Sequence, residues 1–185
     1  MYKGVLIIFS RYWKTYGGTS ALLRSAYFHA AILLLFLTAH FWLTEKWWEQ
    51  SISILPNLLG FSLGGFAMFL GFGDEKFRAL LAEKNDTEAA SAYLNLSASF
   101  VHFIFIQFLA LIAAILAKSL DFHIPLPDCI SISIWWLGKF FHGIGYLLFL
   151  YSITSMLAAT MAVFRTCFWY EVMQNNRSND DDTSI

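Results

Sequence analysis

The stretch LGFSLGGFAMFLGFGDEKF, from Leu59 to Phe77, holds five glycines and five phenylalanines and then changes abruptly to charged residues. In water, a glycine inside a helix costs about 1 kcal/mol relative to alanine. In lipid, helices associate through close packing, and small residues let their backbones approach. Four small residues recur at the spacing of one helix face: Gly60, Gly64, Ala67 and Gly71. They are the predicted helix-packing residues of a membrane helix.

The composition supports a membrane setting for the rest of the chain. Of its 185 residues, 58% are hydrophobic and 14% are charged, against about 25% charged in an ordinary soluble domain. A soluble domain of this size has too little interior to bury so much apolar surface. The net charge of -1, with no basic stripe, argues against a direct nucleic-acid partner.

Four apolar segments are long enough to cross a bilayer, because a helical crossing needs about 20 mostly apolar residues. They cover about residues 26–43, 52–72, 94–116 and 141–164. We expect an all-α integral membrane protein with four transmembrane helices, an N-terminal interfacial helix and a homo-oligomeric bundle. The expected divisions are the interfacial helix at 1–25 with a break at Gly17-Gly18, the membrane domain at 26–164, a cytoplasmic helical loop at 73–93, an irregular outer loop at 118–133, and a cytoplasmic tail at 165–185 that is disordered at its end.

The distribution of positive charge predicts the orientation of the spans. Nine Lys and Arg residues lie in the N-terminal segment, the loop after the second span and the C-terminal tail, and three lie on the opposite side. Cytoplasmic segments carry the excess of Lys and Arg. We therefore expect a multi-pass protein of a bacterial inner membrane with both termini in the cytoplasm.

The phenylalanines of the second span allow two interpretations. Rings such as Phe66, Phe69 and Phe72 can form a hydrophobic constriction when several copies surround a pore. Asp74 and Glu75 would then form an acidic ring at the cytoplasmic mouth, where such rings concentrate cations. Alternatively, the phenylalanines fill space or contact lipid, and the two acidic residues belong to the first solvated turn after the membrane.

Two intramembrane polar residues, His102 and Gln107, lie in the third span. An amide near the middle of a bilayer needs a partner, so Gln107 should face another helix or a water-filled lumen. Hydrogen bonding between helices is the favoured interpretation for Gln107. For His102, the alternatives are an interfacial or inter-helix hydrogen bond and a functional pathway.

No pattern typical of an enzyme is found in the sequence. It contains no carboxylate pair suited to acid–base chemistry, no His/Cys/carboxylate cluster at metal-ligand spacing, and neither GxSxG, a P-loop nor HExxH. We therefore expect no catalytic residue, no cofactor and no metal.

The four-span layout, with a Gly/Phe-rich second helix that is acidic at its inner end, resembles the small membrane subunits of bacterial anti-phage defence systems, such as the four-span component of Kiwa. The segment from Phe9 to Phe77, with FSRYWKTY, a hairpin and LGFGDEKF, resembles the first hairpin of bestrophin channels, where a Phe-lined helix forms the neck. The chain departs from bestrophins because it lacks their long cytoplasmic helical region. These resemblances imply a homo-oligomer that either conducts ions or docks a cytosolic partner, and the first implies antiviral defence.

Two functions from different classes follow as hypotheses. The first is a homo-oligomeric ion channel or pore-forming effector, a homotetramer or pentamer with the second span near the axis. The second is a non-conducting membrane anchor or sensor that recruits a cytosolic effector protein through its cytoplasmic face. The direction in which the phenylalanines of the second span point separates these hypotheses.

Overall fold

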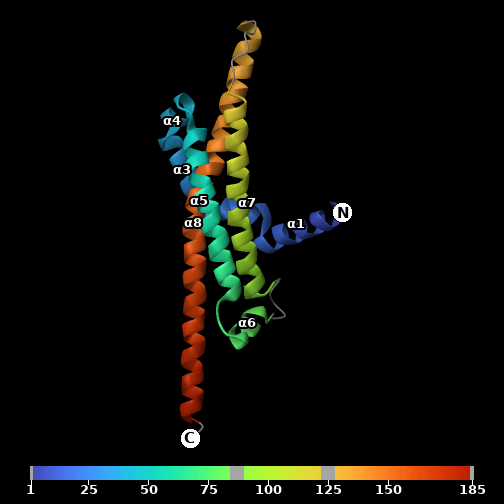
Figure 1. Ribbon diagram of the computed structural model, residues 1–185, viewed down its shortest axis with the longest axis vertical. Helices are drawn as coiled ribbons and strands as arrows, with labels where there is room; N and C mark the ends of the chain where they lie inside the picture. Colours follow the sequence, from blue (N-terminus) through green and yellow to red (C-terminus); the bar gives the residue numbers. More distant parts are fainter. Residues whose placement is uncertain (1, 84–89, 122–127, 184–185) are drawn as a thin grey trace.

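The computed structural model describes residues 2–83, 90–121 and 128–183, and these ranges form α-helices without any strand (Figure 1). The chain is therefore all-α, as the sequence predicts. The helices are α1 (Tyr2–Tyr16), α2 (Gly18–Arg24), α3 (Ala26–Leu37), α4 (Ala39–Thr44), α5 (Trp47–Gly71), α6 (Glu75–Ala82), α7 (Ala92–Ser119) and α8 (Asp128–Thr183).

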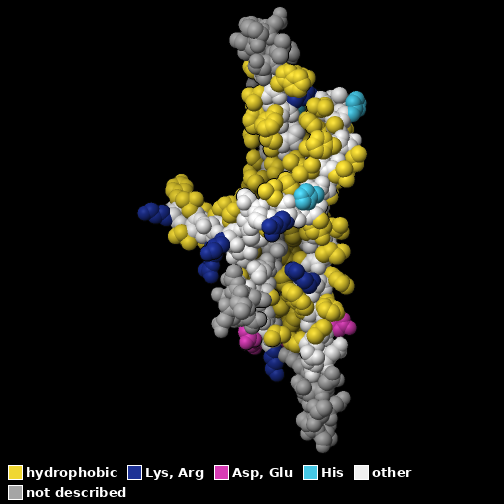
Figure 2. Space-filling view, turned by 180° about the vertical axis from the view of Figure 1, so that it is seen from behind, with side chains coloured by type: hydrophobic (Ala, Val, Ile, Leu, Met, Phe, Trp, Pro, Cys, Tyr) yellow, Lys and Arg dark blue, Asp and Glu magenta, His cyan; other side chains and the backbone are white. Residues whose placement is uncertain are grey.

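Three helices are long and apolar enough to cross a membrane: α5, α7 and the part of α8 from Ile134 to Asn176. They run side by side as an elongated bundle, and α3 packs against α8 on one side of it (Figure 1). Hydrophobic side chains cover much of the outer surface of this bundle, where charged side chains are few (Figure 2). A membrane protein is the fold class that these three helices support.

The first predicted span, 26–43, is not one continuous helix, because α3 ends at Leu37 and α4 begins at Ala39. The indole of Trp42 donates a 3.0 Å hydrogen bond to the carbonyl of Leu35, and the Thr38 hydroxyl donates a 2.7 Å bond to the carbonyl of Leu34. The indole thus pairs the carbonyl of Leu35 near the break, where an unpaired carbonyl would be costly, while the Thr38 hydroxyl adds to the 2.9 Å bond that the Thr38 backbone N–H already donates to Leu34. Hydropathy alone does not reveal this interruption. Helices α2 and α3, joined end to end, are also long and apolar enough for a membrane span, with a bend of 57° between them.

The last predicted span, 141–164, is only the middle of α8. The helix begins at Asp128, within the expected outer loop, and continues through Thr183, where the sequence predicted disorder. No glycine or proline follows Gly145 in the chain, and each added helical residue gains a backbone hydrogen bond. The expected outer loop also includes residues 122–127, which lie outside the described residues.

The core near the N-terminal end of α5 joins three elements. Trp47 and Leu55 of α5 are fully buried with Ala110 of α7 and Phe149 of α8. A methyl group at Gly145 of α8 would lie 2.6 Å from Cη2 of Trp47, so only glycine leaves room for this indole. At Gly145, the absence of a side chain makes room for the side chain of Trp47, and it does not serve to bring two helix backbones together.

Helix α1 projects sideways from the bundle, with its N-terminus away from the long helices (Figure 1). The turn into α2 uses Gly17 at φ 102° and Gly18 at φ 64°, values that side chains rarely tolerate. The predicted break at Gly17-Gly18 is therefore present. The rings of Phe9 and Phe105, 5.5 Å apart, contribute to holding α1 against α7.

Candidate functional site

His102 of α7 lies at the centre of a buried polar cluster that joins three helices. Its Nδ1 is 2.8 Å from the hydroxyl of Tyr12 on α1, and its Nε2 is 3.0 Å from the hydroxyl of Tyr151 on α8. The ring of Tyr16 stacks on the imidazole with centroids 3.8 Å apart and an interplanar angle of 15°. His102 therefore forms inter-helix hydrogen bonds, which is one of the two alternatives left open for it.

The protonation states of this cluster follow from burial. Burial raises the pKa of the Tyr12 phenol, and the neighbouring Tyr16 phenol raises it further. Burial also raises the pKa of Tyr16, and a hydrogen bond with Tyr151 opposes that rise. A neutral imidazole has one donor and one acceptor nitrogen, so one of the phenols Tyr12 and Tyr151 donates to His102 and the other accepts. No sequence motif distinguishes these tyrosines, although a phenol inside an apolar helix signals a need for a partner.

Gln107 makes the second polar contact between helices. Its Nε2 donates a 2.9 Å hydrogen bond to Oγ of Ser62 on α5, and Gln107 is completely buried. Its Oε1 has no hydrogen-bond partner among the described residues. This is the inter-helix hydrogen bond expected for Gln107, and its partner, Ser62, was not predicted from the sequence.

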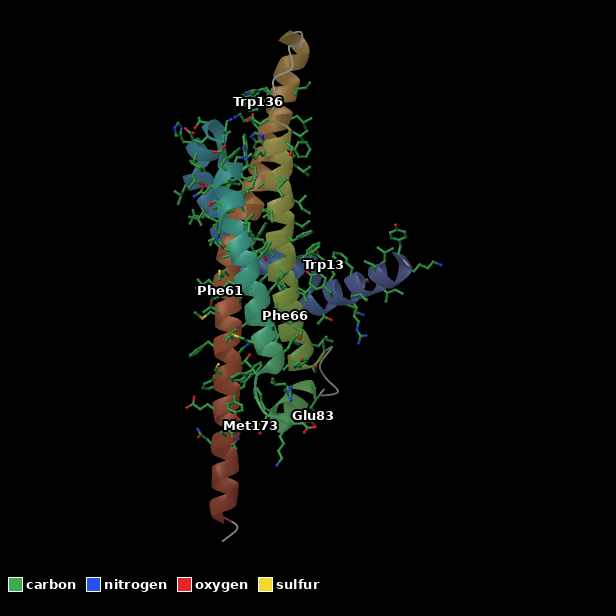
Figure 3. All side chains as sticks on the ribbon, viewed as in Figure 1. Trp13, Phe61, Phe66, Glu83, Trp136 and Met173 are labelled. Carbon is green, nitrogen blue, oxygen red and sulfur yellow. The ribbon has the colours of Figure 1, made fainter. Side chains whose placement is uncertain are left out.

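The three constriction candidates, Phe66 and Phe69 on α5 and Phe72 directly after it, all find ring partners within the chain. Phe66 and Phe69 lie 5.6 and 5.5 Å from the ring of Phe100 on α7, in stacked arrangements. Phe72 lies 5.5 Å from Tyr170 of α8. In Figure 3, Phe66 lies on the side of α5 that faces α7, and Phe61, on another side, is 72% exposed.

The predicted packing residues of α5 are not used inside the protomer. Gly60, Gly64, Ala67 and Gly71 are all exposed. A methyl group at any of these glycines would meet no heavy atom within 4 Å. The small-residue face of α5 is therefore open in the single chain.

The acidic residues after α5 begin α6. Gly73, at φ 80°, makes the turn, and Oδ1 of Asp74 accepts a 2.8 Å hydrogen bond from the backbone N–H of Phe77. Asp74 is thus the N-cap of α6, and Glu75 is exposed in its first turn. The ring of Phe77 is 5.1 Å from that of Tyr170, which fixes α6 against α8.

An apolar cleft of about 450 Å³ lies beside this contact. Its walls come from α6, from the start of α7 and from the C-terminal half of α8. The lining residues are Phe77, Leu80, Leu81, Ala92, Trp169, Val172, Met173 and Asn176. This cleft lies between segments that were expected in the cytoplasm, and it was not identified from the sequence.

No group of three or more His, Cys, Asp or Glu side chains suited to a metal ion is found in the part of the chain that the structure describes. Comparison with protein-family models, with curated proteins and with solved structures found no match.

Proposed function

We propose that this protein is a membrane anchor that associates with copies of itself and recruits a soluble protein to its cytoplasmic face. The observation that carries the proposal is the packing of Phe66 and Phe69 against Phe100 inside one chain. These rings are committed to the protomer, whereas a channel with them on its axis needs them free. The side chains around the cytoplasmic cleft, by contrast, leave an apolar surface available to a partner.

The anchor crosses the membrane four times in this proposal, with α3 and α4 together as the first crossing. Alone, the 12 residues of α3 would span ~18 Å, short of the ~30 Å hydrocarbon layer. With α4 added, the segment from Ala26 to Thr44 approaches that thickness. Four crossings place both termini on one side, and the positive-inside rule assigns that side to the cytoplasm. Helix α1, with Arg11 and Lys14 among its aromatic residues, then lies along the inner leaflet.

Self-association uses the open face of α5. Gly60, Gly64 and Gly71 have empty space around them, and the apolar side chains of Phe61 and Met68 beside them are 72% and 78% exposed. In lipid, such a face gains most from close contact with another helix. A second copy of α5 is the occupant that we propose for it, and a tetramer is the assembly that we expect.

The cytoplasmic partner binds through an apolar helix in the cleft between α6 and α8. Leu80 is 52% exposed, and Val172 is 42% exposed beside the ring of Trp169. These residues form an apolar groove. Amphipathic helices dock in such grooves through apolar side chains at positions i, i+3, i+4 and i+7 of the helix. The resemblance to Kiwa-type subunits makes a phage-infected bacterial host the setting in which to search for this partner.

The decisive experiment compares two substitutions in the cytoplasmic part of α8 that each add one negative charge. Met173→Glu places the charge inside the cleft, and Gln174→Glu places it one residue further on, outside the lining. We expect proteins captured with the wild-type chain from its host to include one that Met173→Glu depletes at least about tenfold, since burying an unpaired carboxylate is costly. Gln174→Glu should retain it. Equal capture by all three chains would refute recruitment through this cleft.

A gated ion channel is the second candidate function, favoured by the open face of α5. Several copies packed through that face would bring α5 close to a common axis, with Glu75 near the cytoplasmic end. Recording from purified oligomer in planar bilayers tests this candidate. Absence of current in the wild type and in Phe69→Ala and Phe72→Ala would discard the channel and leave the anchor.

A further inference from the structure

A cavity of about 390 Å³ opens between the start of α3, α7 and α8, next to the end of α1. Its volume lies within the range of about 300–1,000 Å³ that is usual for small-molecule sites. Six hydroxyl-bearing residues line it: Tyr16, Ser25, Tyr27, Ser99, Tyr151 and Ser155. The remaining wall is mostly apolar, with Phe103 and Met161 among its residues. The cavity therefore suits a ligand with both polar and apolar parts.

Arg165 is the single charged residue in the lining. Its guanidinium lies over the ring of Trp169, 5.2 Å from the ring centroid, and it forms no ion pair with any residue that the structure describes. A guanidinium offers a planar set of donors that matches the oxygens of a phosphate. An arginine without an ion-pair partner, in a cavity lined by several hydroxyl-bearing residues, therefore points to a phosphate-bearing ligand.

The position of Arg165 along α8 places the cavity at one membrane surface. No Asp, Glu, Lys or Arg occurs between Lys139 and Arg165. At 1.5 Å per residue these two cations are ~39 Å apart, close to the ~40–45 Å between the two headgroup layers of a bilayer. Ser155 and Tyr151 lie deeper along the same helix. The cavity thus runs from the headgroup level of one leaflet toward its acyl chains.

We propose that this cavity binds one anionic phospholipid of that leaflet. The phosphate binds Arg165, the glycerol ester oxygens accept hydrogen bonds from hydroxyls such as that of Tyr16, and an acyl chain contacts Met161. The lining contains no carboxylate that would pair with the ammonium group of a zwitterionic lipid. This distinguishes phosphatidylglycerol, which carries net negative charge, from phosphatidylcholine. A soluble phosphate ester has the same phosphate chemistry but cannot use the apolar wall. The inference is independent of the proposed function, and only the identity of the leaflet depends on the proposed orientation.

Native mass spectrometry of the purified full-length chain in detergent tests the proposal. The three probes are phosphatidylglycerol, phosphatidylcholine and glycerol 3-phosphate, each added over a concentration series. We expect one phosphatidylglycerol to bind per chain, at least about tenfold more tightly than either other probe. Phosphatidylcholine brings an ammonium group that no carboxylate of the lining can pair with, and glycerol 3-phosphate has no acyl chain to contact the apolar wall.

Three substitutions locate the site. Arg165→Gln removes the cation and Ala158→Phe fills the cavity, and each should weaken phosphatidylglycerol binding about tenfold or more. Arg24→Gln, which removes an exposed cation of α2 outside the lining, is the matched control and should bind as the wild type does. Circular dichroism and gel filtration verify the fold of each variant. If Ala158→Phe does not fold, Arg165→Gln decides the question, because Arg165 is exposed and its substitution should leave the fold intact. The proposal would be overturned if Arg165→Gln bound phosphatidylglycerol as tightly as the wild type, or if Arg24→Gln weakened binding as much as Arg165→Gln does. It would also be overturned if the wild type bound phosphatidylcholine or glycerol 3-phosphate as tightly as phosphatidylglycerol.

Discussion

Two opposite faces of α5 differ in how completely the chain covers them. One face carries Leu55, Ser62 and Phe69, which are 0%, 5% and 6% exposed. At 3.6 residues per turn, Gly60 and Gly64 lie roughly 180° around the helix from these residues, and both are exposed. The covered face has large and hydrogen-bonding side chains, whereas the open face has small ones. Within α5, Phe66 and Phe69 therefore contact a neighbour inside the protomer, whereas Gly60 and Gly64 face a neighbour that, in our proposal, lies outside it.

Phe69→Ala should produce the largest effect, because it empties part of the covered face. Truncating a buried phenylalanine costs about 3–5 kcal/mol, so we expect the free energy of unfolding in mixed micelles to fall by about that amount. Phe36→Ala in α3 is the matched control, since Phe36 is 72% exposed and exposed substitutions change stability by about 0.5 kcal/mol or less. Equal losses in the two variants would show that the covered face of α5 has been assigned wrongly.

Gly64→Leu tests the open face, with a smaller expected effect and a different readout. The added side chain meets open space in the single chain, so we expect the secondary structure and thermal unfolding of the monomer to be retained. An overfilled interface typically loses about 1–3 kcal/mol, so the oligomer that we propose should dissociate in gel filtration with light scattering. Gly138→Leu makes the same change at a glycine of α8 that also has open space and should leave assembly intact. An unchanged oligomer in Gly64→Leu would exclude this face as the interface.

Ser62→Ala tests the polar contact on the covered face. Removing the hydroxyl leaves Nε2 of Gln107 unpaired beside its already unpaired Oε1. Hydrogen bonds between membrane helices contribute about 0.6–1.7 kcal/mol, so we expect a loss of about 1 kcal/mol in the same micelle assay. Combining Ser62→Ala with Gln107→Leu removes both polar groups, and we expect it to recover most of that loss. A double variant less stable than Ser62→Ala would contradict this explanation.

The sequence predicted those parts of the fold that depend on local pattern. The apolar runs predicted helices at α5 and α7, and the glycine pair at Gly17-Gly18 predicted the turn after α1, because both signals act within a few residues. The interruption at Thr38 was not predictable in this way. It depends on the indole of Trp42 reaching the carbonyl of Leu35, a contact that hydropathy does not report.

The candidate site was less predictable because it depends on which helices become neighbours. Periodicity placed Phe66 and Phe69 together, but only packing against Phe100 shows that they face α7. Likewise, His102 was recognisable as a buried polar residue, yet its partners Tyr12 and Tyr151 come from distant parts of the chain. A single sequence indicates that a buried polar residue needs a hydrogen-bond partner, but it does not show which residue is that partner.

The smallest expected effect concerns the docking of α1 and its dependence on pH. Burial raises the pKa of Tyr12 and Tyr16 in the docked state, so docking disfavours their ionised forms. The stability of docking should therefore be fully present below about pH 10, the ordinary pKa of a phenol, and should decrease as the pH rises above it. Paired spin labels on α1 and α7, in a chain lacking Cys129 and Cys167, would report the release as a longer distance between the labels.

Tyr16→Phe keeps the ring that stacks on His102 and removes one of the two ionising phenols. We expect release of α1 to move to higher pH in this variant, with Tyr12 accounting for the remaining dependence. Tyr2→Phe, at the 87% exposed far end of α1, is the matched control and should release as the wild type does. If the distance between the labels stays constant through the alkaline titration in every variant, α1 is held by its apolar contacts, such as that of Phe9 with Phe105, and the phenols do not control its docking.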